Sequence, residues 1–522
     1  MKSKLLLLTI SAVIAGCGGE DGKSNSAVSS NALSSNAFPN LSTLSTHSVS
    51  LQPVQCNQMQ LVGNSYVQPN TVEKCWFLQV PEDYSQPDGK KITVAVAKTA
   101  SQGIKKGSFI HLNGGPGGMS IDWAEYSNSE LSVLSENHDI YFVDQRGTGY
   151  STPSLSCDFE DSGTAQQIRG CKNKYVNDGV DLNQYTNVNN ALDLLLLEKK
   201  LEEIEEIEDG WKLYGVSYGT RLAMTMAREE QKQIKAGYQS SSAIQMMVLD
   251  GVFPIEMNGV QDMPWSNYEA LDRILEVCRR SVGYCDEATF KSALNTKLTE
   301  IDDKYYDIFL NYLTTISMLR DDNKPFEGQL NPVEFIKQPK ANIEFLLDTL
   351  ITLRANSYDP SYPSQFAAMG LANICAEEPV KPKYYTSHHE SREKWGSAVQ
   401  KAVDGSTHFG LTLEACQAIN IEPVDSSFYA SMESVNYPVL ILNGANDGIT
   451  PPALADVSAN KFTNMLSLTY DQGSHGILTD AQDWAPCLKS LVLSSINEPE
   501  DMLSLDTTCL NTQDFKYVAD MN

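Results

Sequence analysis

The stretch from Lys212 to Thr220 constrains the fold more than any other part of the sequence. An apolar run ends in G-V-S-Y-G at 215–219, and a pattern typical of a helix follows directly. So tight a turn between a strand and a helix leaves no room for a Cβ at either glycine, and it strains the backbone of the serine. The stretch therefore predicts that Ser217 is held out at the carboxyl edge of a β-sheet.

Short apolar runs alternate with helical patterns over much of the chain. Runs near 76–81 and 91–97 predict an antiparallel hairpin, and continuous apolar runs farther on predict buried parallel strands. We expect these later strands at 108–112, 139–143, 211–216, 246–250, 437–443 and 465–470. The alternation is absent from residues 255–430, which have a mainly helical pattern. The sequence thus predicts an α/β core at 53–254 and 431–522, with an inserted helical cap at 255–430.

A glycine-rich loop follows the expected strand at 108–112. It reads Asn-Gly-Gly-Pro-Gly-Gly from Asn113 onward. Alone it would be an ordinary turn, but upstream of the serine motif it suits a second function. The backbone N–H groups of Gly114 and Gly115, together with that of Tyr218, could form an oxyanion hole.

Two polar residues follow late strands. Asp447 comes after the strand expected at 437–443, and His475 comes after the one at 465–470. The order Ser217, Asp447, His475 is that of the α/β-hydrolase fold, in which the histidine takes the serine proton and the aspartate orients the imidazole. Asn-Asp-Gly at 446–448 would also suit an ordinary turn. The strand before it and the later histidine favour a catalytic role.

The composition excludes some functions. The net charge of −27 disfavours nucleic acid as a partner, because phosphate binding needs a basic face. The acidity would suit cationic substrates, but it also simply favours solubility. The sequence has no Cys-x-x-Cys or paired-His spacing of the kind that binds metal, so we expect neither a metal nor an organic cofactor.

The first residues indicate export. Lys2 and Lys4 precede an apolar stretch at 5–14 that is too short to span a membrane. The next residues, Ile-Ala-Gly-Cys at 14–17, resemble a bacterial lipobox. That resemblance implies a signal peptide at 1–16 and lipidation of Cys17; a simple cleaved signal is the alternative.

The lipobox has two further implications. The protein would be exported and held in the cell envelope by its lipid, its only contact with a membrane. No acidic retention signal follows Cys17, which favours the outer membrane. Residues 17–52 are rich in Ser and Asn and predict a flexible tether.

The cysteine count agrees with export, since disulfides persist in oxidising compartments. Cys17 apart, ten cysteines remain, and we predict that they pair in sequential order. The predicted pairs are Cys56–Cys75, Cys157–Cys171, Cys278–Cys285, Cys375–Cys416 and Cys487–Cys509.

The motifs together resemble the exported proline iminopeptidase and tripeptidyl aminopeptidase group of α/β-hydrolases, the S33 serine peptidases. The matching stretches are VPEDY at 80–84, GGPGG at 114–118, DQRGTGYS at 144–151, GVSYGT at 215–220, VLDG at 248–251, PVLILNGANDGITPP at 438–452 and GSHG at 473–476. The segment at 499–509 is similar to the C-terminal TAP-like module. The resemblance covers about 75–510, least in the cap, and it is more specific for fold and mechanism than for substrate.

The resemblance implies cleavage of peptides from a free N-terminus, through an acyl-enzyme. In the family, acidic cap residues bind the substrate's α-ammonium group. Glu377 and Glu378 lie in a similar segment and are the candidates, with a solvated surface pair as the alternative. Asn113 stands where the iminopeptidases often have His, a departure that concerns N-terminal recognition.

Two rival functions remain. An esterase would use the same acyl-transfer groups, and the lining of the cap would distinguish it from a peptidase. A non-catalytic binding protein on a hydrolase scaffold is the second, although it gives no reason for three catalytic residues. The sequence does not indicate an oligomeric state.

Overall fold

The computed structural model describes residues 38–59, 71–157, 163–208, 210–314, 320–321, 324–325, 330–356, 367–378, 390–406, 413–424, 432–483, 485–510 and 515–517. The chain forms two units, Met1–Pro39 and Asn40–Asn522. The second unit contains all the elements described below. The signal peptide, Cys17 and the start of the predicted tether lie outside the described residues.

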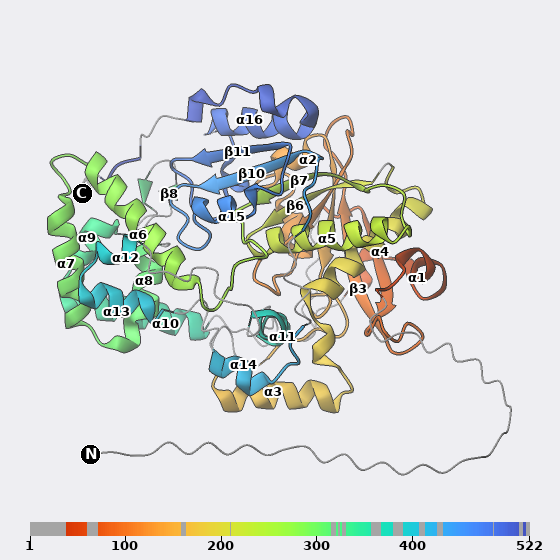
Figure 1. Cartoon of the computed structure of the whole chain (residues 1–522), viewed down its shortest axis with the longest axis horizontal. Helices are drawn as coiled ribbons and strands as arrows, with labels where there is room; N and C mark the ends of the chain where they lie inside the picture. Colours follow the sequence, from red (N-terminus) through yellow and green to blue (C-terminus); the bar gives the residue numbers. More distant parts are fainter. Residues whose placement is uncertain are drawn as a thin grey trace, which may run out of the picture. The chain divides into compact units, whose positions relative to one another are not determined.

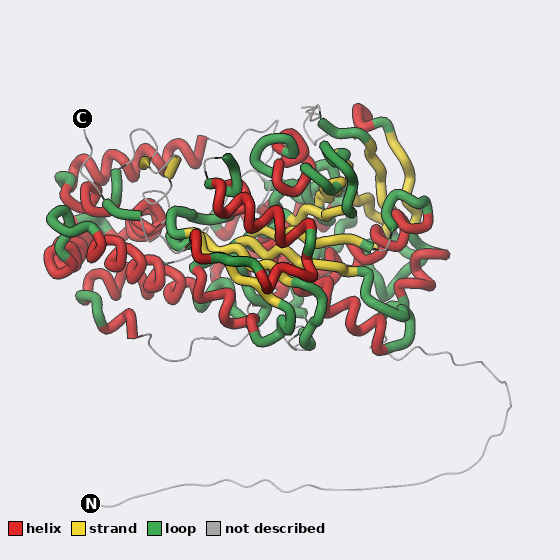
Figure 2. Tube along the Cα trace, turned by 90° about the horizontal axis from the view of Figure 1, so that it is seen from above, coloured by secondary structure: helices red, strands yellow, loops and turns green. Residues whose placement is uncertain are grey.

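A nine-stranded sheet forms the centre of the second unit (Figures 1 and 2). Its order is β1-β2-β3-β5-β4-β6-β7-β10-β11. The strands are β1 (Ser50–Val54), β2 (Lys74–Pro81), β3 (Lys91–Thr99), β4 (Ser108–Leu112), β5 (Asp139–Asp144), β6 (Trp211–Val216), β7 (Ile244–Asp250), β10 (Val439–Gly444) and β11 (Met465–Tyr470). Every pair from β5 to β11 is parallel, and the first three pairings are antiparallel. This confirms the predicted mostly parallel α/β sheet.

The globular unit begins earlier than the composition suggested. Helix α1 (Leu41–His47) packs against α4 (Asn187–Glu203), and β1 pairs with β2 as the edge strand. Both elements overlap the predicted tether at 17–52. Buried Leu41 and Leu44 explain the difference, since a few apolar residues suffice when an existing surface receives them.

Helices cover both faces of the sheet. On one face α4 packs against α5 (Tyr218–Lys235), which in turn contacts β4, β6 and β7. On the other face lie α2 (Ser132–Ser135) and α16 (Pro486–Asn497), whose buried leucines join the main hydrophobic core. Figure 1 shows α16 and α5 on opposite sides of the strands. The strands are therefore buried on both faces, as their continuous apolar runs require.

The segment between β7 and β10 is mainly helical. One hydrophobic cluster joins α6 (Met263–Arg280), α7 (Glu287–Glu300), α8 (Tyr306–Thr314), α9 (Pro332–Lys337), α10 (Lys340–Asn356) and α13 (Ser397–Asp404). Short α12 (Glu390–Glu393) contacts α6, and β8 (Arg320–Asp321) pairs with β9 (Lys324–Pro325). Phe515 and Tyr517, from the predicted second core segment, pack into this same cluster.

Two cap helices belong to a different cluster. Helices α11 (Ala367–Glu377) and α14 (Leu413–Ile419) pack on α3 (Ala165–Asn177), which precedes the elbow in the chain. Figure 1 shows these three helices together, apart from α7 and α13. The region predicted as one cap at 255–430 thus supplies two hydrophobic clusters.

All five predicted disulfides form, in sequential order. The Cα–Cα distances run from 5.0 Å for Cys375–Cys416 to 6.1 Å for Cys487–Cys509, and Cys56–Cys75, Cys157–Cys171 and Cys278–Cys285 lie between them. The bond from Cys375 to Cys416 joins α11 to α14. Among the described residues, no helix combines the length and apolarity that a membrane crossing needs.

Candidate active site

Ser217 stands at the turn between β6 and α5. Its backbone has φ 56° and ψ −126°, a region that few non-glycine residues adopt. A Cβ at Gly219 would lie 1.9 Å from the carbonyl oxygen of Leu112, and one at Gly215 would lie 2.5 Å from that of Gly219. The strained serine and the two obligatory glycines match the sequence prediction for this turn.

Asp447 and His475 meet above the ends of β10 and β11. The Nδ1 atom of His475 lies 2.8 Å from Oδ2 of Asp447. The other carboxylate oxygen accepts the N–H groups of Ile449 and Thr450 at 2.8 and 2.9 Å. Four donors therefore hold this carboxylate in place, the fourth being the hydroxyl of Thr450, 2.7 Å from Oδ2.

The ion pair sets the charge of both groups. Burial opposes the ionised carboxylate, but His475 and the hydrogen bonds of Thr450 hold the pKa of Asp447 below its ordinary value. Burial also opposes the imidazolium, but the negative charge of Asp447 raises the pKa of His475 above its ordinary value. The arrangement gives a histidine that is stabilised once it gains a proton, as a general base in acyl transfer requires.

Ser217 and His475 line one pocket of about 310 Å³. Its other lining residues are His111, Asn113, Gly114, Gly115, Gly118, Trp123, Tyr214, Val216, Ile449, Gly476 and Thr479. The nucleophile candidate, the base candidate and the glycine-rich loop thus come together in one cavity, as the order of the motifs predicted.

The two predicted sources of oxyanion donors differ in whether their backbone N–H groups already have an acceptor. Tyr218 is the first residue of α5, where backbone N–H groups lack helical partners. The N–H of Gly114 donates to Oδ1 of Asn113 at 2.8 Å, so this donor already has an acceptor within the loop. A Cβ at Gly114 would lie 2.9 Å from that of Ser217, which shows how closely the loop approaches the serine. The oxyanion role of Gly114 and Gly115 stays a prediction.

Parts of the chain are similar to known proteins. Residues 401–500 match the family model described as TAP-like protein. Serine protease Hip1 of Mycobacterium tuberculosis is 29% identical over 228 residues, 38% of this chain and 41% of that protein. Tripeptidyl aminopeptidase of Streptomyces coelicolor is 28% identical over 174 residues, 28% of this chain and 31% of that protein.

Residues 401–500 resemble the TAP-like family, and the mostly parallel sheet with helices on both faces is that of an α/β-hydrolase fold. The resemblance to the S33 peptidases that the motifs predicted is thereby confirmed. The chain matches less than half the length of these curated relatives. A solved proline iminopeptidase-related protein from Thermus thermophilus aligns with a TM-score of 0.35 at 15% identity, covering 82% of this chain and 98% of that one.

The acidic pair Glu377 and Glu378 lies inside the protein. Glu377 and Glu378 are both 0% exposed. Glu378 forms an ion pair with the buried Arg221 of α5, and Glu377 lies 3.9 Å from the same guanidinium. Neither carboxylate lines the pocket beside Ser217. The alternative of a solvated surface pair is wrong. The amine-binding role remains a prediction, although Glu378 already forms an ion pair with Arg221.

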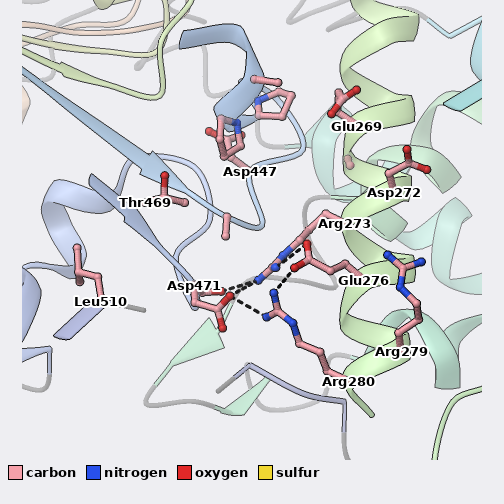
Figure 3. Close-up of a pocket in the computed structure, with 15 residues that line it drawn as sticks. Glu269, Asp272, Arg273, Glu276, Arg279, Arg280, Asp447, Thr469, Asp471 and Leu510 are labelled. Atoms are coloured by element: carbon pink, nitrogen blue, oxygen red, sulfur yellow. Dashed lines mark hydrogen bonds and ion pairs between the residues drawn. The ribbon is translucent and has the colours of Figure 1, made fainter. Parts of the chain in front are cut away.

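A second cavity of about 520 Å³ separates α6 from the loops after β10 and β11 (Figure 3). Asp471 accepts hydrogen bonds from Arg273 and Arg280, both at 2.8 Å. Arg273 also donates to the side chain of Asn446, the neighbour of Asp447, at 2.8 Å. These bonds fasten the first cap helix to the loop that carries Asp447.

Two supporting residues were not singled out from the sequence. Asp250 at the end of β7 accepts the N–H groups of Ile477 and Leu478, directly after His475 and Gly476. Thr450 bonds Asp447 and lies 3.1 Å from Nδ1 of His475. A carboxylate at the carboxyl end of a buried strand was the available signal for Asp250; no pattern marks Thr450.

Asp144 and Arg146, in the DQRGTGYS stretch, hold buried segments together. Asp144 accepts the N–H groups of Ser120, Ile121 and Tyr150, and so holds the segment after the glycine-rich loop. Arg146 forms a two-pronged ion pair with Asp193 at 2.7 Å. Both are fully buried, away from the pocket lining. Across the described ranges, no group of His, Cys, Asp and Glu side chains could hold a metal ion.

Proposed function

We propose that this protein is a serine exopeptidase that removes one or a few residues from peptide N-termini. The observation that carries the proposal is that His475, which is hydrogen-bonded to Asp447, lines the same pocket as the strained Ser217. The names of its relatives support peptide substrates, because one is called a serine protease and another a tripeptidyl aminopeptidase.

The reaction would proceed by acyl transfer. His475 removes the hydroxyl proton of Ser217 as the oxygen attacks the scissile carbonyl carbon. Asp447 stabilises the resulting imidazolium, and backbone N–H groups at Tyr218 and the glycine-rich loop stabilise the oxyanion. The proton then passes from His475 to the leaving amine. Water repeats the sequence on the acyl-enzyme and releases the product.

A panel of fluorogenic amides tests the proposal. The chain from Asn40 onward would be given aminoacyl and tripeptidyl amides, each with a free and a blocked N-terminus. We expect cleavage of the free-amine substrates, little cleavage of the blocked ones, and loss of both in Ser217→Ala. Equal cleavage of free and blocked peptides would rule out an exopeptidase that recognises the N-terminus.

An esterase is the second candidate. Carboxylesterase B of Mycobacterium tuberculosis is 31% identical over 86 residues, 16% of this chain and 16% of that protein. The acyl-transfer groups serve esters as well as amides, so the same panel includes short acyl esters. Ester turnover without amide turnover would replace the peptidase proposal. Failure of Ser217 to react with a fluorophosphonate would instead favour a non-catalytic binding protein.

We further propose that the protein is exported and anchored by a lipid on Cys17. The five disulfides support this location, because such bonds persist in oxidising compartments. Metabolic labelling with a palmitate analogue should label the full chain but not Cys17→Ser. Equal labelling of the two would overturn the anchor.

A further inference from the structure

The pocket beside Ser217 has an aromatic inner wall. His111, Trp123 and Tyr214, which we call the aromatic recess, line it together with the serine. The His111 ring lies 5.9 Å from the Trp123 ring and 5.5 Å from the Tyr214 ring, centroid to centroid. Such rings offer an apolar surface with polar atoms only at their edges.

His111 is held in its neutral form. The Ser120 hydroxyl donates to the carbonyl oxygen of His111 at 2.9 Å, so it accepts a hydrogen bond from Nδ1–H of the ring at 2.7 Å. This fixes the tautomer and leaves Nε2 without a proton. Burial lowers the pKa of His111 to about 3, so the ring carries no charge at any pH at which the protein would work.

Among the described residues that line the pocket, none is Asp, Glu, Lys or Arg. Carboxyl groups neighbour three of the lining residues instead. Asp122 precedes Trp123 in the chain, Asp250 accepts from the Tyr214 hydroxyl at 3.2 Å, and Asp480 follows Thr479. A charged side chain would lose its hydration in the recess with no Asp, Glu, Lys or Arg in this lining to pair with it.

The glycine-rich loop fixes which part of a substrate the recess can receive. The attacked carbonyl must sit over Ser217 with its oxygen toward the loop, and the leaving group must lie near His475, which protonates it. Gly114, Gly115 and Gly118 line this cavity and lie between His111 and Trp123 in the chain, whereas His475 comes from the loop after β11. The group attached to the acyl side of the carbonyl is therefore the one nearest the recess.

We propose that the aromatic recess is the specificity pocket for the acyl side of the substrate, and that it selects an uncharged, apolar side chain on the residue whose carbonyl Ser217 attacks. The cavity volume of about 310 Å³ is at the small end of the range for ligand pockets, which suits one side chain. The inference rests on acyl transfer by Ser217, as proposed above, and not on recognition of a free N-terminus.

Nitrophenyl esters with one common leaving group test it, because they need no amine. The acyl groups would be acetyl, 3-phenylpropanoyl and hemisuccinyl. We expect kcat/KM for 3-phenylpropanoyl to exceed that for acetyl by about tenfold or more. Hemisuccinyl, which brings a carboxylate, should fall below 3-phenylpropanoyl by on the order of 100-fold.

Two variants change the recess in opposite ways. Trp123→Ala removes an apolar wall, and Thr479→Phe fills the cavity; each should lower the 3-phenylpropanoyl to acetyl ratio by about tenfold. Ile104→Ala is the control, since Ile104 is 83% exposed and precedes β4, at the end of that strand away from the pocket. Circular dichroism and fluorophosphonate labelling of Ser217 would show that each variant is folded.

Unchanged ratios in both variants would overturn the proposal. The proposal would also be overturned if the two variants changed relative kcat/KM values only across a series of leaving groups on a fixed acetyl group. The recess would then bind the leaving-group side of the substrate. Loss of free-amine dependence in the amide panel, with the ester ratios as expected, would reject the exopeptidase proposal and leave the recess assignment intact.

Discussion

The carboxylate of Asp250 accepts a hydrogen bond from the backbone N–H of Ile477, two residues after His475, at 2.9 Å. Its second oxygen accepts the N–H of Leu478 at 2.8 Å. Asp250 ends a central strand, so these bonds connect the loop that carries the candidate base to the middle of the sheet. The position of the His475 loop therefore depends on a residue outside the predicted triad.

We expect Asp250→Ala to lower kcat by about 10- to 100-fold with a smaller effect on KM, because small misplacements of a catalytic group carry costs of that size. Asp250→Asn keeps one acceptor oxygen and should lose less. The measurements are steady-state kinetics on the best ester or amide, with thermal unfolding alongside. A purely structural role would lower the melting temperature and leave kcat of the folded protein unchanged.

The sequence predicted those parts of the molecule that depend on local pattern. The elbow at Ser217 follows from two glycines and an apolar run, and the disulfides pair cysteines that are near in sequence. The parallel sheet and the positions of Asp447 and His475 follow from repeated strand and helix patterns, since parallel strands align their carboxyl ends at one edge.

Contacts between distant segments could not be read in this way. Glu377 and Glu378 have the pattern of a surface pair, and only the fold brings Arg221 to them. Leu41 and Leu44 lie in a polar stretch, and their burial needs the surface of α4. The aromatic recess combines residues from β4, β6 and the segment at 121–126, so no single stretch of the sequence predicts it.

The activity should depend on pH through His475. Only the neutral imidazole can take the serine proton, and Asp447 raises the pKa of His475 above 6.5 even though burial opposes the charge. Activity is therefore lost as pH falls through that raised pKa, and the acid limb of kcat/KM should have its midpoint above pH 6.5. In Asp447→Asn the midpoint should move to lower pH, with kcat reduced by about 10⁴-fold. An unmoved midpoint would show that another group controls the limb.

The approach of the glycine-rich loop to the serine gives a steric prediction. In Gly114→Ala the new Cβ would lie 2.9 Å from Cβ and 3.4 Å from Oγ of Ser217, so the loop must move. We expect kcat/KM to fall by about 100-fold or more, as when an oxyanion donor is lost.

Gly170→Ala is the matched control: Gly170 lies in α3 with no described atom within 4 Å of the added Cβ. It should keep its activity and gain up to about 1 kcal/mol of stability. Equal kinetics in the two variants would contradict the predicted role of the loop.

The buried charges at Arg221, Glu377 and Glu378 predict that removing the cation costs more stability than removing one carboxylate charge. Arg221→Met leaves both carboxylates without their cation, and removing one partner of a buried pair costs about 3–5 kcal/mol. Glu378→Gln should cost less, because Arg221 keeps Glu377 at 3.9 Å and its bonds to the carbonyl oxygens of Pro254 and Met257. Urea unfolding of the two variants gives the free energies of unfolding.

If Glu378 instead serves the substrate's ammonium group, Glu378→Gln will raise KM for free-amine peptides while KM for simple esters stays the same. A loss of stability without that selective rise in KM would assign Glu378 a structural role, in which its carboxylate binds Arg221 and the backbone N–H of Gly259.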